Sequence, residues 1–366
     1  MAVDTPTGWT GRCYRWLQER LHFETAVSFF AKKTVPRHRG TVWYYFGGVT
    51  LFLFAIQLLT GILLLLYYKP SAEQAFESVQ FIMTEVEFGW LVRSVHSWGA
   101  NLLILMAFIH LFSTFLMKAY RPPRELTWMS GVVLMLLMMA FGFTGYLLPW
   151  NDLALAATKV GTEIAGSVPF VGELLKEFLR GGEDVTGATL TRMFGFHVAL
   201  LPAASAVVLL LHLVLVQVQG MSEPLSWSSL KDEERKRRQM KFFPNFFYRD
   251  VLAWLIALWI LAAVASLFPW ELGNKADLFA PTPPDVAPEW YFMFMYVTLE
   301  AFTFSVFGIP NKMIVVSLFG ILGMLLFLMP FIDRKARGGE PSPLLTAIGW
   351  FAIAYIAATT AIGYLQ

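Results

Sequence analysis

The amino-acid sequence predicts an all-α membrane protein with seven transmembrane helices, and two observations support this fold class. Apolar residues make up 57% of the 366 positions, charged residues only 15%, and the mean hydropathy is +0.56, well above that of an ordinary soluble domain. The chain also contains seven apolar runs whose lengths are close to or above the ~20 residues that a helix needs to cross a hydrocarbon core of ~30 Å. These runs are, approximately, 43–68, 88–117, 127–149, 190–217, 251–268, 313–331 and 344–364.

The segment 1–41, before the first span, is basic and has no continuous apolar core, so it does not resemble a secretory signal. Aromatic residues such as Trp9 and Trp16 favour an amphipathic helix on the cytoplasmic membrane surface, and a disordered basic tail is the alternative. Cys13 is the one cysteine of the chain, which excludes intrachain disulfides and cysteine-bound iron–sulfur clusters.

The charges between the spans alternate in sign, and this alternation predicts the orientation. The N-terminal segment, the loop 118–124, the run 231–241 and residues 334–337 are basic, whereas the loop 69–87 is acidic. By the positive-inside rule, the N-terminus is cytoplasmic and the C-terminus lies outside, in a bacterial inner membrane. The net charge of +2 gives no indication of nucleic-acid binding.

A charged cytoplasmic linker, 220–250, divides the chain into a four-helix domain, 42–219, and a three-helix domain, 251–366. Two long outer segments, 151–189 and 270–312, connect spans, and loops of that length often carry function.

Four of the six histidines lie within predicted spans: His96 and His110 on the second, His197 and His212 on the fourth. Steps of fourteen and fifteen residues correspond to ~21 Å and ~22.5 Å along a helix and return to within ~40° and ~60° of the starting face. Both helices run inward, so His96 and His197 form an outer pair and His110 and His212 an inner pair.

Two stacked pairs of imidazoles indicate two bis-histidine haem b groups, because a haem needs only two axial protein ligands. Zinc fits poorly, since each level offers two ligands and no acidic or thiol group that would complete a tetrahedron. A proton relay would have to bridge gaps of ~21 Å. A single intramembrane histidine is more often a packed, hydrogen-bonded side chain, but two matching pairs are harder to explain in that way.

Glycines repeat at the histidine period. Gly47 and Gly61 on the first span, and Gly131 and Gly145 on the third, are each fourteen residues apart, which suits close approach to a flat macrocycle. Ordinary small-residue packing between membrane helices is the alternative. Arg93 and Arg192 precede histidines and could meet haem propionates, or could be cationic side chains that extend to the membrane edge.

The outer segment 270–312 contains the sequence Pro288-Glu289-Trp290-Tyr291 beside an aromatic run. A carboxylate among apolar rings should have a raised pKa, which suits proton acceptance from a bound phenol. The alternative is a solvated Glu289 next to an interfacial aromatic belt.

Seven short motifs resemble those of the cytochrome b family of cytochrome bc complexes, especially its photosynthetic, plastoquinol-oxidising branch. The resemblance covers most of the chain from about 14 to 330, and the fifteen-residue step from His197 to His212 also resembles that branch. The branch divides the protein into two chains, which are fused here. The motifs are IMTE at 82–85, FGWLVRSVH at 88–96, PRELTW at 123–128, GYLLPW at 145–150, LTR at 190–192, PEWY at 288–291 and PNK at 310–312.

The resemblance implies a Q-cycle coupled to proton translocation. Quinol would bind at the outer face near Glu289, Tyr291 and Tyr146, with Glu289 accepting a proton. One electron would pass to a Rieske iron–sulfur protein and then to a c-type cytochrome subunit or similar acceptor. The other would pass through the two haems to an inner quinone site. The family also implies a homodimer.

Three features depart from the family pattern. The photosynthetic branch attaches a third haem to a cysteine where this chain has Tyr45, so we do not expect that covalent haem. Gln217 and Val218 stand where that branch has basic residues, which leaves the inner quinone site poorly defined. The segment 298–308 looks longer than its family counterpart, and its role is not indicated.

Two other classes of function remain open at this stage. A di-haem membrane anchor of a dehydrogenase or hydrogenase would pass electrons to quinone, but such anchors have fewer helices and no Pro-Glu-Trp-Tyr segment. A haem-free transporter would explain seven spans but not the histidine pairs.

Overall fold

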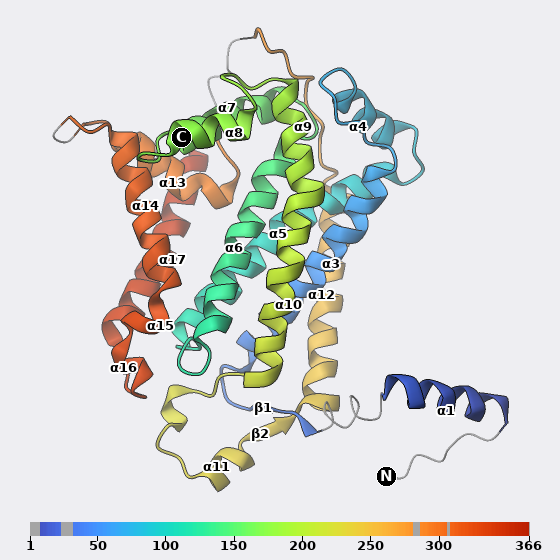
Figure 1. Ribbon diagram of the computed structural model, residues 1–366, viewed down its shortest axis with the longest axis vertical. Coiled ribbons are helices and arrows are strands. Elements are labelled where there is room, and N and C mark those ends of the chain that lie inside the picture. The colour runs from blue at the N-terminus through green and yellow to red at the C-terminus, as the bar shows by residue number, and fades with distance from the viewer. Residues whose placement is uncertain (1–7, 23–31, 281–285, 306–307, 366) are drawn as a thin grey trace.

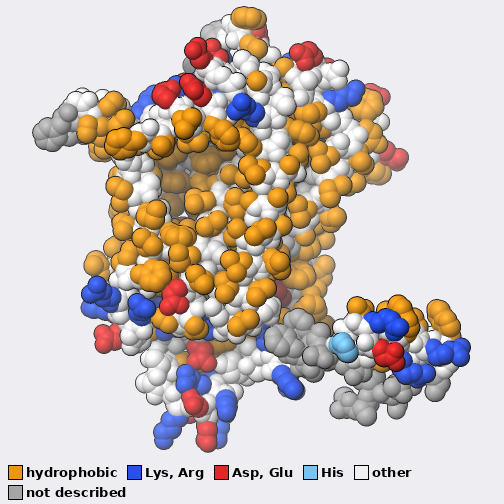
Figure 2. Space-filling view, in the orientation of Figure 1, with side chains coloured by type: hydrophobic (Ala, Val, Ile, Leu, Met, Phe, Trp, Pro, Cys, Tyr) orange, Lys and Arg blue, Asp and Glu red, His pale blue; other side chains and the backbone are white. Residues whose placement is uncertain are grey.

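The computed structural model describes residues 8–22, 32–280, 286–305 and 308–365, and it is an upright bundle of long helices (Figure 1). Helices α4, α7 and α8 lie at one end of the bundle, together with the C-terminal end of the chain, and α1 and α11 lie at the other. Hydrophobic side chains cover the middle of the face in Figure 2, and charged side chains gather at its two ends. This distribution is the one that a membrane imposes.

Six helical stretches of the described chain are long and apolar enough to cross a membrane. They correspond to six of the seven predicted spans. They are Thr41–Leu65 (η1, Thr41–Tyr44, and α3, Tyr45–Leu65), α5 (Gly89–Leu116), α6 (Glu125–Tyr146), Gly187–Gln219 (α9, Gly187–Gly195, η2, Phe196–Leu200, and α10, Leu201–Gln219), Phe242–Leu267 (η4, Phe242–Phe246, and α12, Phe247–Leu267) and α17 (Pro343–Leu365).

The remaining apolar run forms α14 (Asn311–Phe327), whose 17 residues span about 26 Å. The helix ends at Phe327, and the short helix α15 (Met329–Ile332) follows after Leu328, with Pro330 in its first turn. A proline in this position starts a new helix more readily than it continues an old one. That α14 crosses the membrane as a seventh span therefore remains a prediction.

The remaining elements lie at the two ends of the bundle. The segment 9–21 is helical, as expected, although residues 1–7 and 23–31 of the predicted surface segment lie outside the described residues. These elements are α1 (Trp9–Leu21), β1 (Thr34–Pro36), α4 (Ala75–Thr84), α7 (Asp152–Gly166), α8 (Gly172–Arg180), η3 (Leu225–Trp227), α11 (Asp232–Arg237), β2 (Gln239–Lys241), α13 (Trp290–Ala301) and α16 (Arg334–Arg337).

The main core joins both predicted parts of the chain. Helix α3 packs against α5, and α6 packs against α10, but α12 also packs against α3 and α5. In the C-terminal region, α13 packs against α17 and α14, and Tyr291 of α13 is part of the same buried cluster as Leu53 and Leu103. The division at 220–250 therefore remains a proposal about domains.

Two long-range backbone pairings fix the ends of the bundle. Strand β1 pairs antiparallel with β2, with Val35 opposite Met240, and so attaches the segment before the first span to the linker. At the other end, the Asn151 side chain donates to the Leu272 carbonyl at 2.7 Å, and the backbone of Asn151 bridges to Lys275. The segment after α12 is thereby held across the start of α7.

Candidate functional site

The structure brings His96 of α5 and His197 of η2 close together at the level nearer α7, which the charge pattern predicts to be outer. Their ring centroids are 6.3 Å apart, and the ring planes are inclined by 73°. Two imidazoles that bind one metal atom from opposite sides, with bonds of about 2.0–2.1 Å, place their ring centroids roughly 6 Å apart. The outer pair therefore has the separation that a shared metal atom requires.

His110 of α5 and His212 of α10 form the inner level, where they lie close enough for the charge of one imidazole to act on the other. Both side chains are partly buried between helices. The structure thus brings all four predicted histidines together as two pairs, one pair at each depth.

A widened turn explains why fifteen residues separate the histidines of one helix and fourteen those of the other. In η2 (Phe196–Leu200) the Leu201 amide donates to the Phe196 carbonyl five residues earlier, which is π-helical geometry. Pro202 follows and has no amide to continue the α-helical pattern. The wide turn absorbs one residue, so His197 and His212 face the same side. The fifteen-residue spacing is visible in the sequence, but we did not predict the π-helical turn. Pro202 could have indicated it.

The four predicted glycines lie directly against the imidazole rings. A methyl group at any of them would come within 3.4 Å of the Cε1 atom of one histidine, and the glycines separate into the same two levels. The space beside each glycine, which we predicted for a haem macrocycle, is thus occupied by an imidazole ring. Contact between these glycines and haem remains a prediction. The Cβ-to-Cε1 distances are Gly47 to His110, 2.9 Å; Gly61 to His96, 3.4 Å; Gly131 to His212, 3.3 Å; and Gly145 to His197, 2.6 Å.

These distances predict different outcomes for alanine at Gly145 and at Gly61, which lie at the same level. Gly145→Ala would press on His197 and should lower outer-haem content severely, whereas Gly61→Ala makes only ordinary contact and should be mild. Redox titration of the purified variants measures the outer centre. Equal losses in both variants would mean that these glycines make room for the macrocycle instead of the imidazole.

Three of the four imidazoles have a hydroxyl group as a partner, which the sequence analysis missed. Each hydroxyl donates to a carbonyl of its own helix and can then accept a hydrogen bond from the histidine Nδ1–H. The partners are Thr60 to His96 at 2.9 Å, Ser130 to His212 at 3.0 Å and Thr144 to His197 at 3.1 Å. The helix carbonyls are those of Ile56, Thr127 and Ala140.

Because each hydroxyl group already donates to a carbonyl, this pattern favours the tautomer with the proton on Nδ1. A proton on Nδ1 leaves the Nε2 lone pair free, and a metal-bound histidine commonly uses its other ring nitrogen in this way. Each hydroxyl residue directly precedes one of the glycines, so a Ser/Thr-Gly pair was the sequence signal. His110 is the exception: Phe46 precedes Gly47, and the His110 Nδ1 has no hydrogen-bond partner among the described residues.

The donor set fits haem better than a bare metal ion. Within the described chain, no group of three or more His, Cys, Asp or Glu side chains could hold a metal ion. A haem supplies four equatorial ligands itself and needs only two opposed imidazoles with free Nε2 atoms. The residues present therefore fit two haems.

The two candidate propionate-binding arginines are engaged by backbone carbonyls. Arg93 donates to the carbonyls of Trp270 and, at 3.0 Å, of Glu271, while Arg192 donates to the Phe178 carbonyl at 2.5 Å. Contact of either side chain with a propionate remains a prediction. At the inner end, Tyr45 stacks on Phe246 at a centroid distance of 4.7 Å.

The predicted outer-site residues come together where α13 begins. Glu289 directly precedes α13 and is half-buried, and desolvation raises its pKa. Tyr291 is 4% exposed, and its hydroxyl lies against Gly142, one turn before Tyr146 on α6. Glu289 lies close enough to Tyr146 and Tyr291 for its charge to act on their phenol groups, and the same is true of Tyr364, which was not predicted.

A second carboxylate, also missed, lies near the inner level. Asp250 of α12 packs against Gly48, next to the glycine that contacts His110. Its Oδ1 atom is buried and makes no hydrogen bond of ordinary geometry among the described residues, and the side chain of Trp254, one turn along α12, is its polar neighbour. Buried carboxyl groups are costly and often mark functional positions in membrane proteins.

Comparison with known proteins identifies relatives along the whole chain. Residues 30–220 match the family described as Cytochrome b/b6/petB, and residues 275–366 match Cytochrome b(C-terminal)/b6/petD. The cytochrome bc complex cytochrome b subunit of Chlorobaculum thiosulfatiphilum is 48% identical over 346 residues, which cover 94% of this chain and 79% of that protein. Cytochrome b6 of Synechococcus elongatus is 44% identical over 214 residues, which cover 58% of this chain and 99% of that protein.

A solved structure agrees with these matches. A chain of the hyperthermophilic respiratory Complex III superposes with a TM-score of 0.78 at 28% sequence identity. The superposition covers 95% of this chain and 96% of that chain. The similarity therefore extends to the arrangement of nearly all the helices.

Proposed function

The chain belongs to the cytochrome b family, with both halves fused in one polypeptide, and on this basis we propose that it oxidises quinol at its outer face in a cytochrome bc-type complex. Membership makes it an integral membrane protein and an electron-transport subunit of an oxidoreductase complex. It also removes the two competing classes, the haem-free transporter and the di-haem anchor of a dehydrogenase or hydrogenase.

The observation that carries the proposal is the pair of opposed imidazoles at each of two depths, with hydroxyl groups that leave Nε2 atoms free. His96 and His197 would hold the outer haem b, and His110 and His212 the inner one. Bound in this way, two haems supply one-electron transfer between the outer and inner halves of the membrane.

The outer site would bind the quinol head group among Glu289, Tyr291 and Tyr146. A half-buried carboxylate with a raised pKa holds a proton more readily than an exposed one, which suits acceptance from a phenol. The buried Tyr291 hydroxyl fixes the start of α13 against α6 and so positions Glu289. At the inner level, Asp250 is the candidate group for exchange of protons with a quinone.

The proposed cycle sends one quinol electron to a Rieske iron–sulfur protein and the other to an inner quinone, with protons released outside. A c-type cytochrome subunit would accept electrons from the Rieske protein, and the complex would be a homodimer in a bacterial inner membrane with the N-terminus in the cytoplasm. The basic linker and the acidic outer loops support this orientation.

The purified complex tests the proposal directly. We expect a b-type absorption band, two non-covalent haems per chain by pyridine-haemochrome analysis, and quinol oxidation that outer-site quinone analogues inhibit. Absence of b-type haem, or a haem that remains covalently attached to this chain, would contradict the assignment.

A matched pair of threonines on α3 tests the role of the hydroxyl partners. Thr60→Val removes the acceptor for the His96 Nδ1–H and should speed haem loss from the outer site roughly 10–100-fold. Thr50→Val should have no such effect, because that hydroxyl also donates within the helix, to the Phe46 carbonyl at 2.8 Å, but contacts no histidine. Transfer of haem to apomyoglobin measures the loss, and equal rates in both variants would argue against the assigned tautomer.

A further inference from the structure

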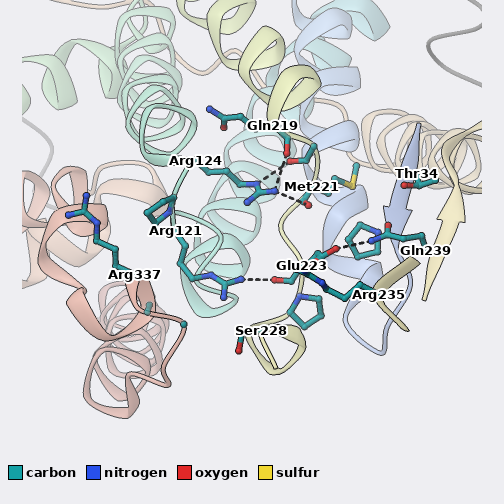
Figure 3. A pocket seen from close by; sticks show the side chains of 16 residues that line it. Thr34, Arg121, Arg124, Gln219, Met221, Glu223, Ser228, Arg235, Gln239 and Arg337 are labelled. Atoms are coloured by element: carbon teal, nitrogen blue, oxygen red, sulfur yellow. Dashed lines mark hydrogen bonds and ion pairs between the residues drawn. The ribbon is translucent and has the colours of Figure 1, made fainter. Parts of the chain in front are cut away.

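The end of the bundle that carries α11 has two cavities that share Pro224 in their linings but differ in chemistry. The first, of about 470 Å³, is lined by four arginines (Figure 3). Arg124 donates to the carbonyls of Gln219, Gly220 and Met221, and Arg121 to that of Glu223. The guanidinium groups of Arg121 and Arg124 are thus already bound to the end of α10 and the start of the linker. We therefore propose no ligand for the first cavity.

The second cavity is larger, about 720 Å³, and its lining is mainly apolar. It lies between the start of η1 and α3, the C-terminal end of α5 and the start of α17, where three spans reach the same membrane surface. Trp43 and Trp350 are part of its lining, and tryptophan is enriched at the level of lipid head groups. The position and lining suit a lipid molecule.

Lys118 is the only Lys, Arg, Asp or Glu among the described residues that line this cavity. Its side chain is 3% exposed, and its ammonium nitrogen has no hydrogen-bond acceptor in the described part of the chain. The nitrogen lies 4.9 Å from the centre of the Phe115 ring, a weak cation–π contact. Burying a cation without a hydrogen-bonded partner is costly.

Neighbouring polar groups do not supply that partner. Asp333 interacts electrostatically with Lys118, but its oxygens accept hydrogen bonds from Tyr120, Ser342 and the Ala336 amide. His38 also lines the cavity, but its Nδ1 accepts from the Gly40 amide and its Nε2 bonds the Tyr44 hydroxyl.

We propose that this second cavity binds an anionic phospholipid, with the phosphate on Lys118 and an acyl chain along the apolar lining between Trp43 and Trp350. A lysine ammonium on a flexible four-carbon chain can turn toward a phosphate that enters beside it. The lipid would join the starts of α3 and α17 to the end of α5, and so connect the haem-bearing helices to the C-terminal part.

The test uses the purified, delipidated complex and short-chain lipids, with bound lipid counted by native mass spectrometry. We expect phosphatidylglycerol to bind at least about tenfold more tightly than phosphatidylcholine. Lys118→Met should remove that preference, whereas Lys335→Met, at an exposed position on nearby α16, should keep it. Haem spectra confirm that each variant is folded.

A second variant keeps the test decisive if Lys118→Met does not fold. Ala347→Phe fills the apolar lining and should weaken binding of both lipids without changing haem content. Equal binding of the two lipids by the wild type, or unchanged phosphatidylglycerol binding in both variants, would overturn the proposal. So would competition by inorganic phosphate at the concentration of the lipid, which would indicate a bare anion site, or capture of a polypeptide by a photo-crosslinker at position 347.

Discussion

The variant His110→Ala should lose the inner haem and retain the outer one, so that haem content falls from two to about one per chain. His110 is the axial candidate on α5 at the inner level, and the other histidine of that helix, His96, lies fourteen residues away at the outer level. His212, the partner of His110, would keep its hydrogen bond to Ser130 but would supply only one of the two axial ligands that the haem iron needs. Reduction of the outer centre by quinol should persist, while reduction of the inner quinone should fall at least about a hundredfold.

Redox titration with pyridine-haemochrome analysis measures this loss of the inner haem. Two further histidine variants serve as controls. His22→Ala replaces a histidine at the end of the surface helix α1 and should retain both centres. His96→Ala should give the reciprocal result, with loss of the outer centre and of electron entry. Two intact b centres in His110→Ala would disprove the inner assignment.

His110 is the one haem-ligand candidate whose Nδ1 atom has no hydrogen-bond partner among the described residues. The ring of His110 packs against Gly47, whereas each of the other three imidazoles also has a side-chain hydrogen bond. The orientation of the His110 imidazole therefore depends more on the backbone of α3 than that of the other three imidazoles does.

The histidine pairs could be predicted from the sequence because they depend on local properties. An apolar run of sufficient length must be helical in a membrane, and helical rise and rotation then fix the depth and face of each histidine. The same reasoning paired Gly47 with Gly61 and Gly131 with Gly145. It could not show that the glycines contact the imidazole rings, because that depends on how closely α3 and α6 approach α5 and α10.

Features that depend on contacts distant in sequence could not be predicted. The pairing of Asn151 with the segment around Leu272 joins residues more than a hundred positions apart, and nothing in either stretch identifies the other. Arg93 illustrates the same limit, because its backbone partners follow α12. The end of α14 at Phe327 is a local feature, and Pro330 could have indicated it.

The variant Glu289→Gln should slow quinol oxidation by roughly 10²–10⁴-fold, the range that a positioned general base contributes. Desolvation raises the pKa of the Glu289 carboxyl, so the group loses its proton at a higher pH than an exposed glutamate does. As pH rises through that raised pKa, more of the wild-type protein carries the carboxylate that can accept a proton. The wild-type rate should therefore rise with pH in this range.

Glutamine has nearly the same shape but cannot take up a proton, so the variant should lose the pH-dependent rise as well as the rate. Haem content should not change, because the imidazole pairs lie on other helices. Glu300→Gln is the matched control, since Glu300 lies on the same helix α13 but is exposed at its other end. Steady-state rates of quinol oxidation between pH 5 and 9, measured for the wild type and both variants, test whether Glu289 accepts the proton. A Glu289→Gln profile parallel to that of the wild type would assign the proton to another group, and Tyr146 and Tyr364 would be the next side chains to replace.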